Sequence, residues 1–181
     1  MGLNLINLMK DYITPEVISK ASTFVGENEN NTANAVSSIV PTVIGGLLNK
    51  AQSENGLSAI SNLLSTGGHN GSVLSNVLNL FNGGEQTDNI IKGGSSALAT
   101  IFGENKLADI AGLISNQSGV QAGGASKLLN LVTPLVLGLI GKQVAGSGTN
   151  GLASLLADQK EFVAAAAPSG LAGLLGLGSL S

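Results

Sequence analysis

The 181-residue sequence contains no cysteine and no arginine. Without cysteine there can be no disulfide, no thiolate metal ligand and no cysteine nucleophile. The eight positive residues are lysines, scattered from Lys10 to Lys160. Nucleic-acid binding needs a clustered basic face, usually with arginine for bidentate contacts, so we expect no nucleic-acid partner.

Charged and aromatic side chains are also scarce, at 10% and 3% of the sequence, whereas apolar residues make up 43%. The core is therefore expected to consist of Leu, Ile, Val and Ala, and much of the surface of Asn, Ser, Thr and Gly. A net charge of −3 and a mean hydropathy of +0.35 predict at least one exposed apolar patch. Contact with a protein partner and self-association therefore both stay open.

No segment has the pattern of a secretory signal or of a membrane span. Residues 1–7 lack a basic region followed by an apolar run, which favours the cytoplasm and leaves envelope association open. The uncharged apolar stretch between Lys127 and Lys142 is shorter than the ~20 residues that cross a bilayer. Residues 162–181 carry no charge, but Pro168 and several glycines make them a poor span, so only contact with a membrane surface stays open.

A long apolar stretch at 36–48 carries a proline at its centre. Its large apolar residues recur at the three- and four-residue spacing of one helix face, and the pattern keeps its phase across Pro41. A proline inside a helix removes one hydrogen bond and costs ~3 kcal/mol. We therefore predict a kinked, buried helix held by its neighbours; two short helices broken at Val40 are the alternative. Gly45, one turn on, would let a second helix approach closely.

A second stretch, 128–140, repeats the first. Three pairs share an offset of 93 (134 − 41 = 93): Pro41 with Pro134, Gly45 with Gly138, and Gly26 with Gly119. We predict a single helical domain over 1–181 in which two similar units pack as one pseudo-symmetric core. Repeat one covers about 1–84 and repeat two about 85–166, and a small-residue apolar tail occupies 167–181.

No segment alternates apolar and polar residues over a strand's length, so the predicted fold is an all-α helical bundle. Thr14 and Pro15 mark a clear helix start and Gly26 a stop, and Thr32 is the expected cap of the central helix. A break is expected at Gly93-Gly94, inside the helix that opens near Thr87. The expected helices are 3–12 (with Leu5, Leu8, Met9 and Tyr12 inward), 15–25, 33–51, 54–66, 73–81, 88–102, 105–115, 120–144 and 152–166.

Few residues are candidates for a chemical site. His69, the only histidine, lies in a glycine-rich loop without a nearby acid, so an exposed loop residue is favoured over a metal ligand or general base. Glu27 and Glu29 could bracket a cation, although a solvated loop is favoured. Residues 146–151 match G-x-G-x-x-G, but a long helix precedes them where a dinucleotide site needs a strand, so a helix–helix loop is expected. The G-x-x-x-G at 119–123 indicates close helix contact at most.

The two proline stretches, the glycine stops and the tail sequence A-A-P-S-G-L-A-G-L-L-G at 166–176 resemble one known family. The sequence is similar, over nearly its whole length, to the bacterial domain of unknown function 937 family, whose members include YidB-like proteins. This resemblance implies a helical bacterial domain without assigned activity and offers no catalytic residues. Some relatives are followed by an OmpA-like peptidoglycan-binding domain; none follows the tail here, so anchoring by such a domain is not expected.

The sequence therefore predicts a non-enzymatic helical scaffold or protein-interaction module, without catalytic, cofactor-binding or metal-binding residues. The alternative is an envelope- or membrane-associated protein that uses its uncharged C-terminal tail. A small-molecule binder or hydrolase with an unrecognised site is the third hypothesis.

Overall fold

The computed structural model describes residues 4–66, 77, 81, 83–144 and 148–166, and no strand occurs in these ranges, as predicted. Several predicted features lie outside the described residues: His69, most of the expected helix 73–81, and the tail 167–181. The elements in chain order are α1 (Leu5–Tyr12), α2 (Pro15–Val25), α3 (Glu29–Lys50), α4 (Glu54–Thr66), α5 (Gly84–Phe102), α6 (Glu104–Ser118), α7 (Ala122–Val144), α8 (Gly148–Asp158) and α9 (Lys160–Ala166).

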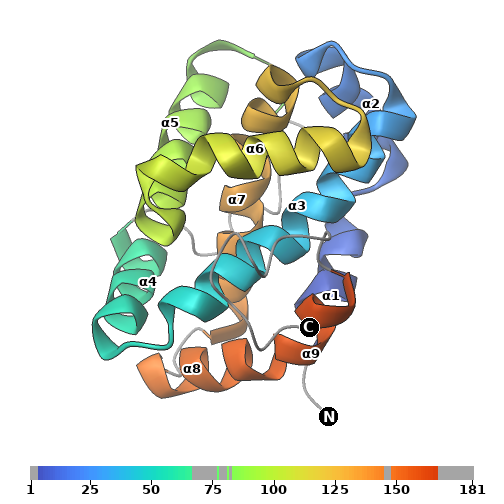
Figure 1. The fold of residues 1–181 in the computed structure, drawn as a ribbon. Helices are drawn as coiled ribbons and strands as arrows, with labels where there is room; N and C mark the ends of the chain where they lie inside the picture. The colour runs from blue at the N-terminus through green and yellow to red at the C-terminus, as the bar shows by residue number, and fades with distance from the viewer. Residues whose placement is uncertain (1–3, 67–76, 78–80, 82, 145–147, 167–181) are drawn as a thin grey trace.

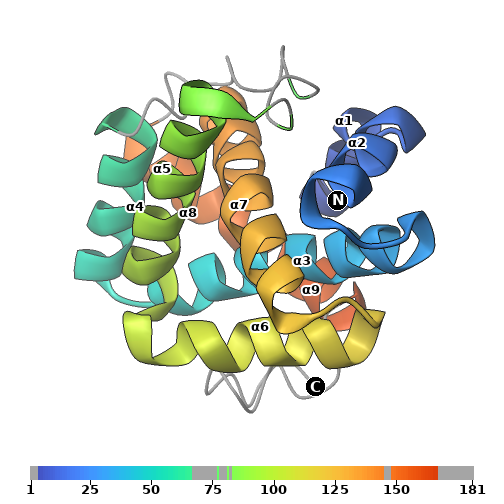
Figure 2. The same cartoon turned by 90° about the horizontal axis from the view of Figure 1, so that it is seen from above.

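Two long helices, α3 and α7, form the centre of the bundle (Figure 1). The helix α7 packs against α3, α5 and α6, and α6 also packs against α3. In both views α4 and α5 lie on one side of this centre and α1 and α2 on the other (Figure 2). Every described helix contributes at least one side chain to the buried apolar cluster. The core consists mainly of aliphatic side chains, as the composition predicted.

Both prolines lie inside these central helices, Pro41 in α3 and Pro134 in α7, and both are buried. The prediction of a continuous helix through Pro41 is confirmed, and the alternative of a break at Val40 is wrong. A threonine stands beside each proline and donates its hydroxyl to a carbonyl four residues back. Thr42 bonds to the carbonyl of Ser38 and Thr133 to that of Leu129, both at 2.6 Å. Hydrogen bonds from a threonine hydroxyl to a carbonyl one turn earlier accompany helix bending. A proline inside a helix also bends it, so the two features are consistent with each other.

The helix α5 packs over the point where Pro134 interrupts the hydrogen bonding of α7. Proline has no N–H, so the carbonyl of Asn130, four residues earlier, loses its helical partner. Gly94 of α5 lies directly over this carbonyl: a Cβ added to Gly94 would stand 2.8 Å from the Asn130 carbonyl carbon and closer still to its oxygen. The predicted break at Gly93-Gly94 is therefore wrong. The helix α5 runs through both glycines, and Gly94 permits a close approach rather than ending the helix.

A second close contact involves Gly46 of α3. A Cβ there would stand 2.5 Å from Cζ of Phe102 and 2.8 Å from Cγ2 of Ile101. The sequence placed such a contact at Gly45, the neighbouring residue. Gly45 is buried, as is Gly138.

The ends of the helices follow their local signals, with two corrections. Thr14 caps α2, and Gly26 and Gly119 close α2 and α6 in the left-handed conformation, at φ 74° and 89°. Thr32 does not cap α3: Asn28 does, since its Oδ1 accepts from the Asn31 amide at 2.7 Å, and Thr32 is buried within the helix. An Asn28 cap places the acidic Glu29 in the first turn, where the helix dipole favours it.

Other predicted details of the helices also changed. The helix α5 begins at Gly84, before Thr87, because the Thr87 hydroxyl bonds back to the Gly83 backbone from inside the first turn. The helix α6 reaches Ser118, beyond the predicted end at 115, and α1 buries Leu5 and Met9 while Leu8 and Tyr12 are half-buried.

The predicted helix 152–166 is instead two helices, α8 and α9, separated at Gln159. The Gln159 side chain is fully buried, and its Oε1 accepts from the Leu5 amide at 2.9 Å. Its Nε2 donates to the carbonyl of Leu155 at 3.0 Å. Leu5 is the first residue of α1, so its amide needs an acceptor outside its own helix. Gln159 therefore joins the start of α1 to the junction of α8 and α9.

Candidate functional site

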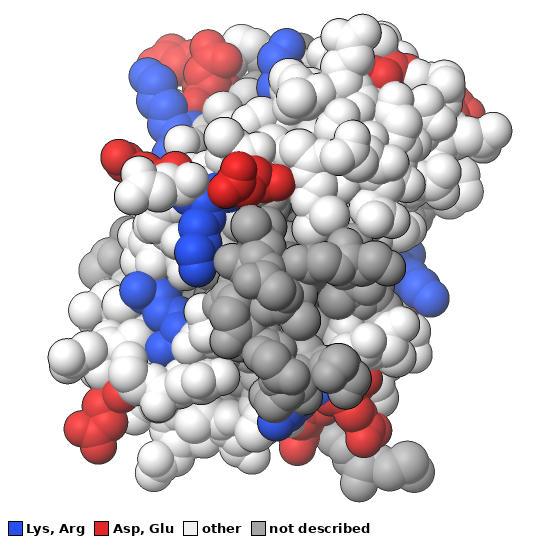
Figure 3. All heavy atoms as spheres, viewed as in Figure 1, with Lys and Arg blue, Asp and Glu red and all other residues white. Residues whose placement is uncertain are grey.

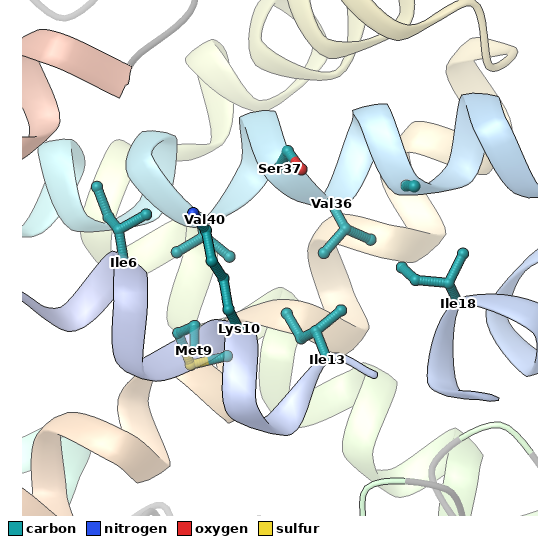
Figure 4. Close-up of a pocket in the computed structure, with 9 residues that line it drawn as sticks. Ile6, Met9, Lys10, Ile13, Ile18, Val36, Ser37 and Val40 are labelled. Atoms are coloured by element: carbon teal, nitrogen blue, oxygen red, sulfur yellow. The ribbon is translucent and has the colours of Figure 1, made fainter. Parts of the chain in front are cut away.

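A recess between α1, α2 and α3 is the candidate site (Figure 4). It encloses about 160 Å³ and has mostly apolar walls. In Figure 4 the side chains of Ile6 and Lys10 extend from α1 toward α3, and those of Val36 and Val40 extend from α3 toward α1. The residues that line it are Ile6, Met9, Lys10, Ile13, Ile18, Ala33, Val36, Ser37 and Val40.

The recess follows from the amphipathic pattern of two helices. The lining residues of α3 are 33, 36, 37 and 40, and those of α1 and its cap are 6, 9, 10 and 13. Both sets have the i, i+3, i+4, i+7 spacing of one helix face. Ile13 and Ile18 hold the positions before and four after the Thr14 cap, which are the positions of a hydrophobic staple. Both isoleucines line the recess, so the junction between α1 and α2 forms part of its wall.

The floor and the rim of the recess differ in chemistry. Met9, Val36 and Val40 are buried at the floor, whereas Lys10 and Ser37 are exposed at the rim. Lys10 is the one ionisable residue in the lining. It makes no ion pair or hydrogen bond with any residue in the described part of the chain. An apolar floor under a single cation is suited to binding and orienting an apolar group, and it brings no acid and base together.

The acidic candidates do not form a cation site in the described ranges. Glu27 Oε2 accepts from the Gln121 amide at 3.1 Å, just before the start of α7. Next to it, the Asn31 side-chain amide donates to the carbonyl of Gly119 at 3.3 Å. Glu29 lies instead in the first turn of α3. Glu27 therefore caps a distant helix, and no group of three or more His, Cys, Asp or Glu side chains in the described ranges could hold a metal ion.

The two glycine motifs are parts of helix ends. The expected loop at 146–151 is wrong over 148–151, because α8 begins at Gly148, and 146–147 lie outside the described residues. In the G-x-x-x-G at 119–123, Gly119 is the cap that ends α6 and Gly123 lies in α7, so the two glycines do not share one helix. A Cβ on Gly123 would meet nothing within 4 Å, whereas one on Gly119 would stand 3.0 Å from Nδ2 of Asn31 in α3, so only Gly119 lies in a close contact.

Charged side chains are thinly spread over the face drawn in Figure 3. Among the described residues of this face, Lys, Asp and Glu stand in small groups separated by uncharged side chains.

The family model described as "Bacterial protein of unknown function (DUF937)" matches residues 7–143. The chain belongs to this family. The span that matches DUF937 runs from α1 to the end of α7 and contains every lining residue of the recess except Ile6. The helices α8 and α9 lie beyond it. No curated protein and no solved structure matches the sequence.

One described helix of this DUF937 protein, α7, is long and apolar enough to cross a bilayer. It has 23 residues and a mean hydropathy of 1.4 in its most apolar window, so it meets the length criterion that the shorter stretch at 127–142 did not. Within the fold, however, 78% of that window is buried. Core helices of water-soluble proteins share this property, and α7 has the position of a core helix here.

Lys10 and Ser37, which form the rim of the recess, were not singled out from the sequence. The sequence indicates them only by their positions. Lys10 lies three residues before Ile13, and Ser37 lies three residues before Val40, so each polar residue shares a helix face with an apolar one. That arrangement is common on half-buried helices and is not specific for a site. Gln159 was missed as well, since a glutamine within a helical pattern normally faces solvent.

Proposed function

We propose that this DUF937 protein is a non-enzymatic protein-interaction module that receives an apolar side chain of a partner in the α1–α2–α3 recess. The observation that carries the proposal is the recess itself, an apolar hollow of about 160 Å³ with an exposed rim. Interfaces obtain most of their binding energy from a few anchor side chains that fill such hollows.

The size of the recess favours a partner's side chain over a cofactor or substrate. Pockets for drug-sized ligands and cofactors usually enclose ~300–1,000 Å³ and combine apolar walls with several converging polar groups. This recess is smaller, and its lining offers only Lys10 and Ser37 as polar side chains. General acid–base catalysis needs at least one side chain positioned to transfer a proton with a substrate. Lys10 is the only ionisable residue in the lining and is exposed at the rim, which supports a non-enzymatic role.

The proposal is tested by cross-linking in living cells. A photoreactive phenylalanine analogue replaces Asn34, which is exposed on α3 beside the recess but outside its lining, and the matched control carries it at Ser58, exposed on α4 at the other side of the bundle. We expect a discrete protein adduct from position 34 that position 58 does not give. The adduct should disappear when Ala33→Leu, in the lining, narrows the recess. Adducts that are identical at both positions, or absent at both, would contradict the proposal.

We also propose that the chain is an internal duplication in which α2, α3 and α4 correspond to α6, α7 and α8. Support comes from the left-handed caps Gly26 and Gly119 and from the prolines Pro41 and Pro134, each pair 93 residues apart (119 − 26 = 93; 134 − 41 = 93). An experimental structure tests it by superposition of 15–66 on 104–158. Helices that align individually but not under one common rotation would contradict a duplication.

A further inference from the structure

We infer that the recess recognises an acidic amphipathic segment of the partner. One large aliphatic or aromatic side chain of that segment enters the recess, and a carboxylate on the same segment pairs with Lys10. This inference rests on the proposed interaction function and specifies the chemistry of the partner.

The volume of the recess limits the size of the side chain that can enter it. A dry, apolar cavity of ~150 Å³ holds one benzene molecule. At about 160 Å³, this recess therefore accepts one group of that size, such as the side chain of Leu, Ile, Met or Phe. The floor of Met9, Val36 and Val40 offers the entering group no hydrogen bond, so a polar side chain would lose its bonds to water there without replacement.

The positive charge of Lys10 determines which group of the partner is favoured beside the entering side chain. Lys10 is exposed at the rim, and Figure 4 shows its side chain reaching across the recess from α1 toward α3. A group that enters the recess must pass next to this ammonium. No acid in the described part of the chain neutralises Lys10, so its field acts on the incoming segment. A carboxylate near the anchor is attracted and a second cation is repelled, which gives both specificity and a faster encounter.

The binding test starts from a displayed library of random peptides, selected on the intact 181-residue protein and counter-selected on Ser37→Phe, which fills the rim. Fluorescein-labelled copies of the selected peptides are then titrated by fluorescence anisotropy. We expect sequences in which a large apolar residue lies within one helical turn of Asp or Glu. Ser37→Phe should weaken their binding at least tenfold, whereas the matched control Ser58→Phe should leave it unchanged.

The charge pairing is tested by a swap between protein and peptide. Lys10→Met keeps the aliphatic stem and should weaken binding about two- to fivefold, the range for an exposed ion pair. Lys10→Glu should weaken it further, and replacing the acid of the peptide with lysine should restore affinity for Lys10→Glu alone. Because Lys10 and Ser37 are exposed, these variants should retain the thermal stability of the original protein.

Different failures have different meanings. If Ser37→Phe blocks peptide binding but Lys10→Glu does not affect it, the inference of an acidic partner segment is wrong. The proposed interaction function would not be affected by that result. If no selected peptide is sensitive to Ser37→Phe and position 34 gives no specific cross-link, both the inference and the proposed interaction function are wrong. A tighter affinity for the peptides after deletion of 167–181 would identify the chain's own tail as the occupant. Dimers that are detected by light scattering and dissociated by Ser37→Phe would identify a second copy of the chain as the occupant. A tail or a second copy as the occupant would overturn the inference.

Discussion

Replacing Gly94 with alanine perturbs the contact between α5 and α7 at a single atom. The new Cβ would stand against the carbonyl of Asn130, whose carbon lies 2.8 Å from the ideal Cβ position. This neighbour is backbone in the middle of a buried helix, so it cannot rotate away as a side chain would. Overpacking of this kind costs ~1–3 kcal/mol, and a rigid neighbour favours the upper end. The gain in helix propensity from glycine to alanine offsets about 1 kcal/mol.

We therefore expect Gly94→Ala to lower the free energy of unfolding by about 2 kcal/mol, the difference between these two terms. Gly93→Ala is the matched control, because Gly93 is exposed and a Cβ there would meet nothing within 4 Å. It should raise stability by up to about 1 kcal/mol. For a chain of this length each kcal/mol corresponds to roughly 2–4 °C in Tm, so the two variants should differ by about 6–12 °C in calorimetry. Equal shifts in the same direction would refute the close contact.

Three further substitutions test other contacts by urea unfolding. Gln159→Leu leaves a buried amide of α1 without its acceptor and should lower the free energy of unfolding by ~1–3 kcal/mol, whereas no change would mean that the bond is dispensable. Glu27→Ala removes the cap before α7 and should lower the free energy of unfolding by ~1 kcal/mol. Glu27→Gln keeps an acceptor and should lower it by less than half of that, so equal losses in the two variants would argue against capping. Gly46→Ala should cost up to about 2 kcal/mol, because overpacking against the ring of Phe102 costs ~1–3 kcal/mol and helix propensity offsets about 1 kcal/mol. Phe102→Leu in the same chain should recover part of this loss, and strictly additive losses would contradict the contact.

Local signals predicted most of the helices. Thr14, Pro15 and Gly26 bound α2 as expected, because a cap, a fixed φ and a left-handed stop act within a few residues. The phase of the apolar residues through Pro41 was also informative, since burial against neighbouring helices outweighs the cost of the proline.

Contacts between distant segments explain what the sequence did not predict. Gly94 looked like a helix breaker, because a single sequence cannot distinguish a glycine that ends a helix from one that lets another backbone approach. Asn28 and Thr32 are both good caps, and the choice between them follows from the burial of Thr32 in the core. The recess was not predictable either, because it is space between helices whose angles are set by packing.

The bond between Leu5 and Gln159 has a consequence for how this protein is made. Its donor and acceptor are 154 residues apart, so the amide that begins α1 leaves the ribosome long before its acceptor exists. At the ~5–20 residues per second of synthesis, that delay is roughly 8–30 s. The α1 segment must stay out of aggregates throughout this interval, although its apolar face has no finished binding site. Stable folding of α1 is therefore expected to wait for the synthesis of the junction between α8 and α9, because that junction supplies the acceptor for the first amide of α1.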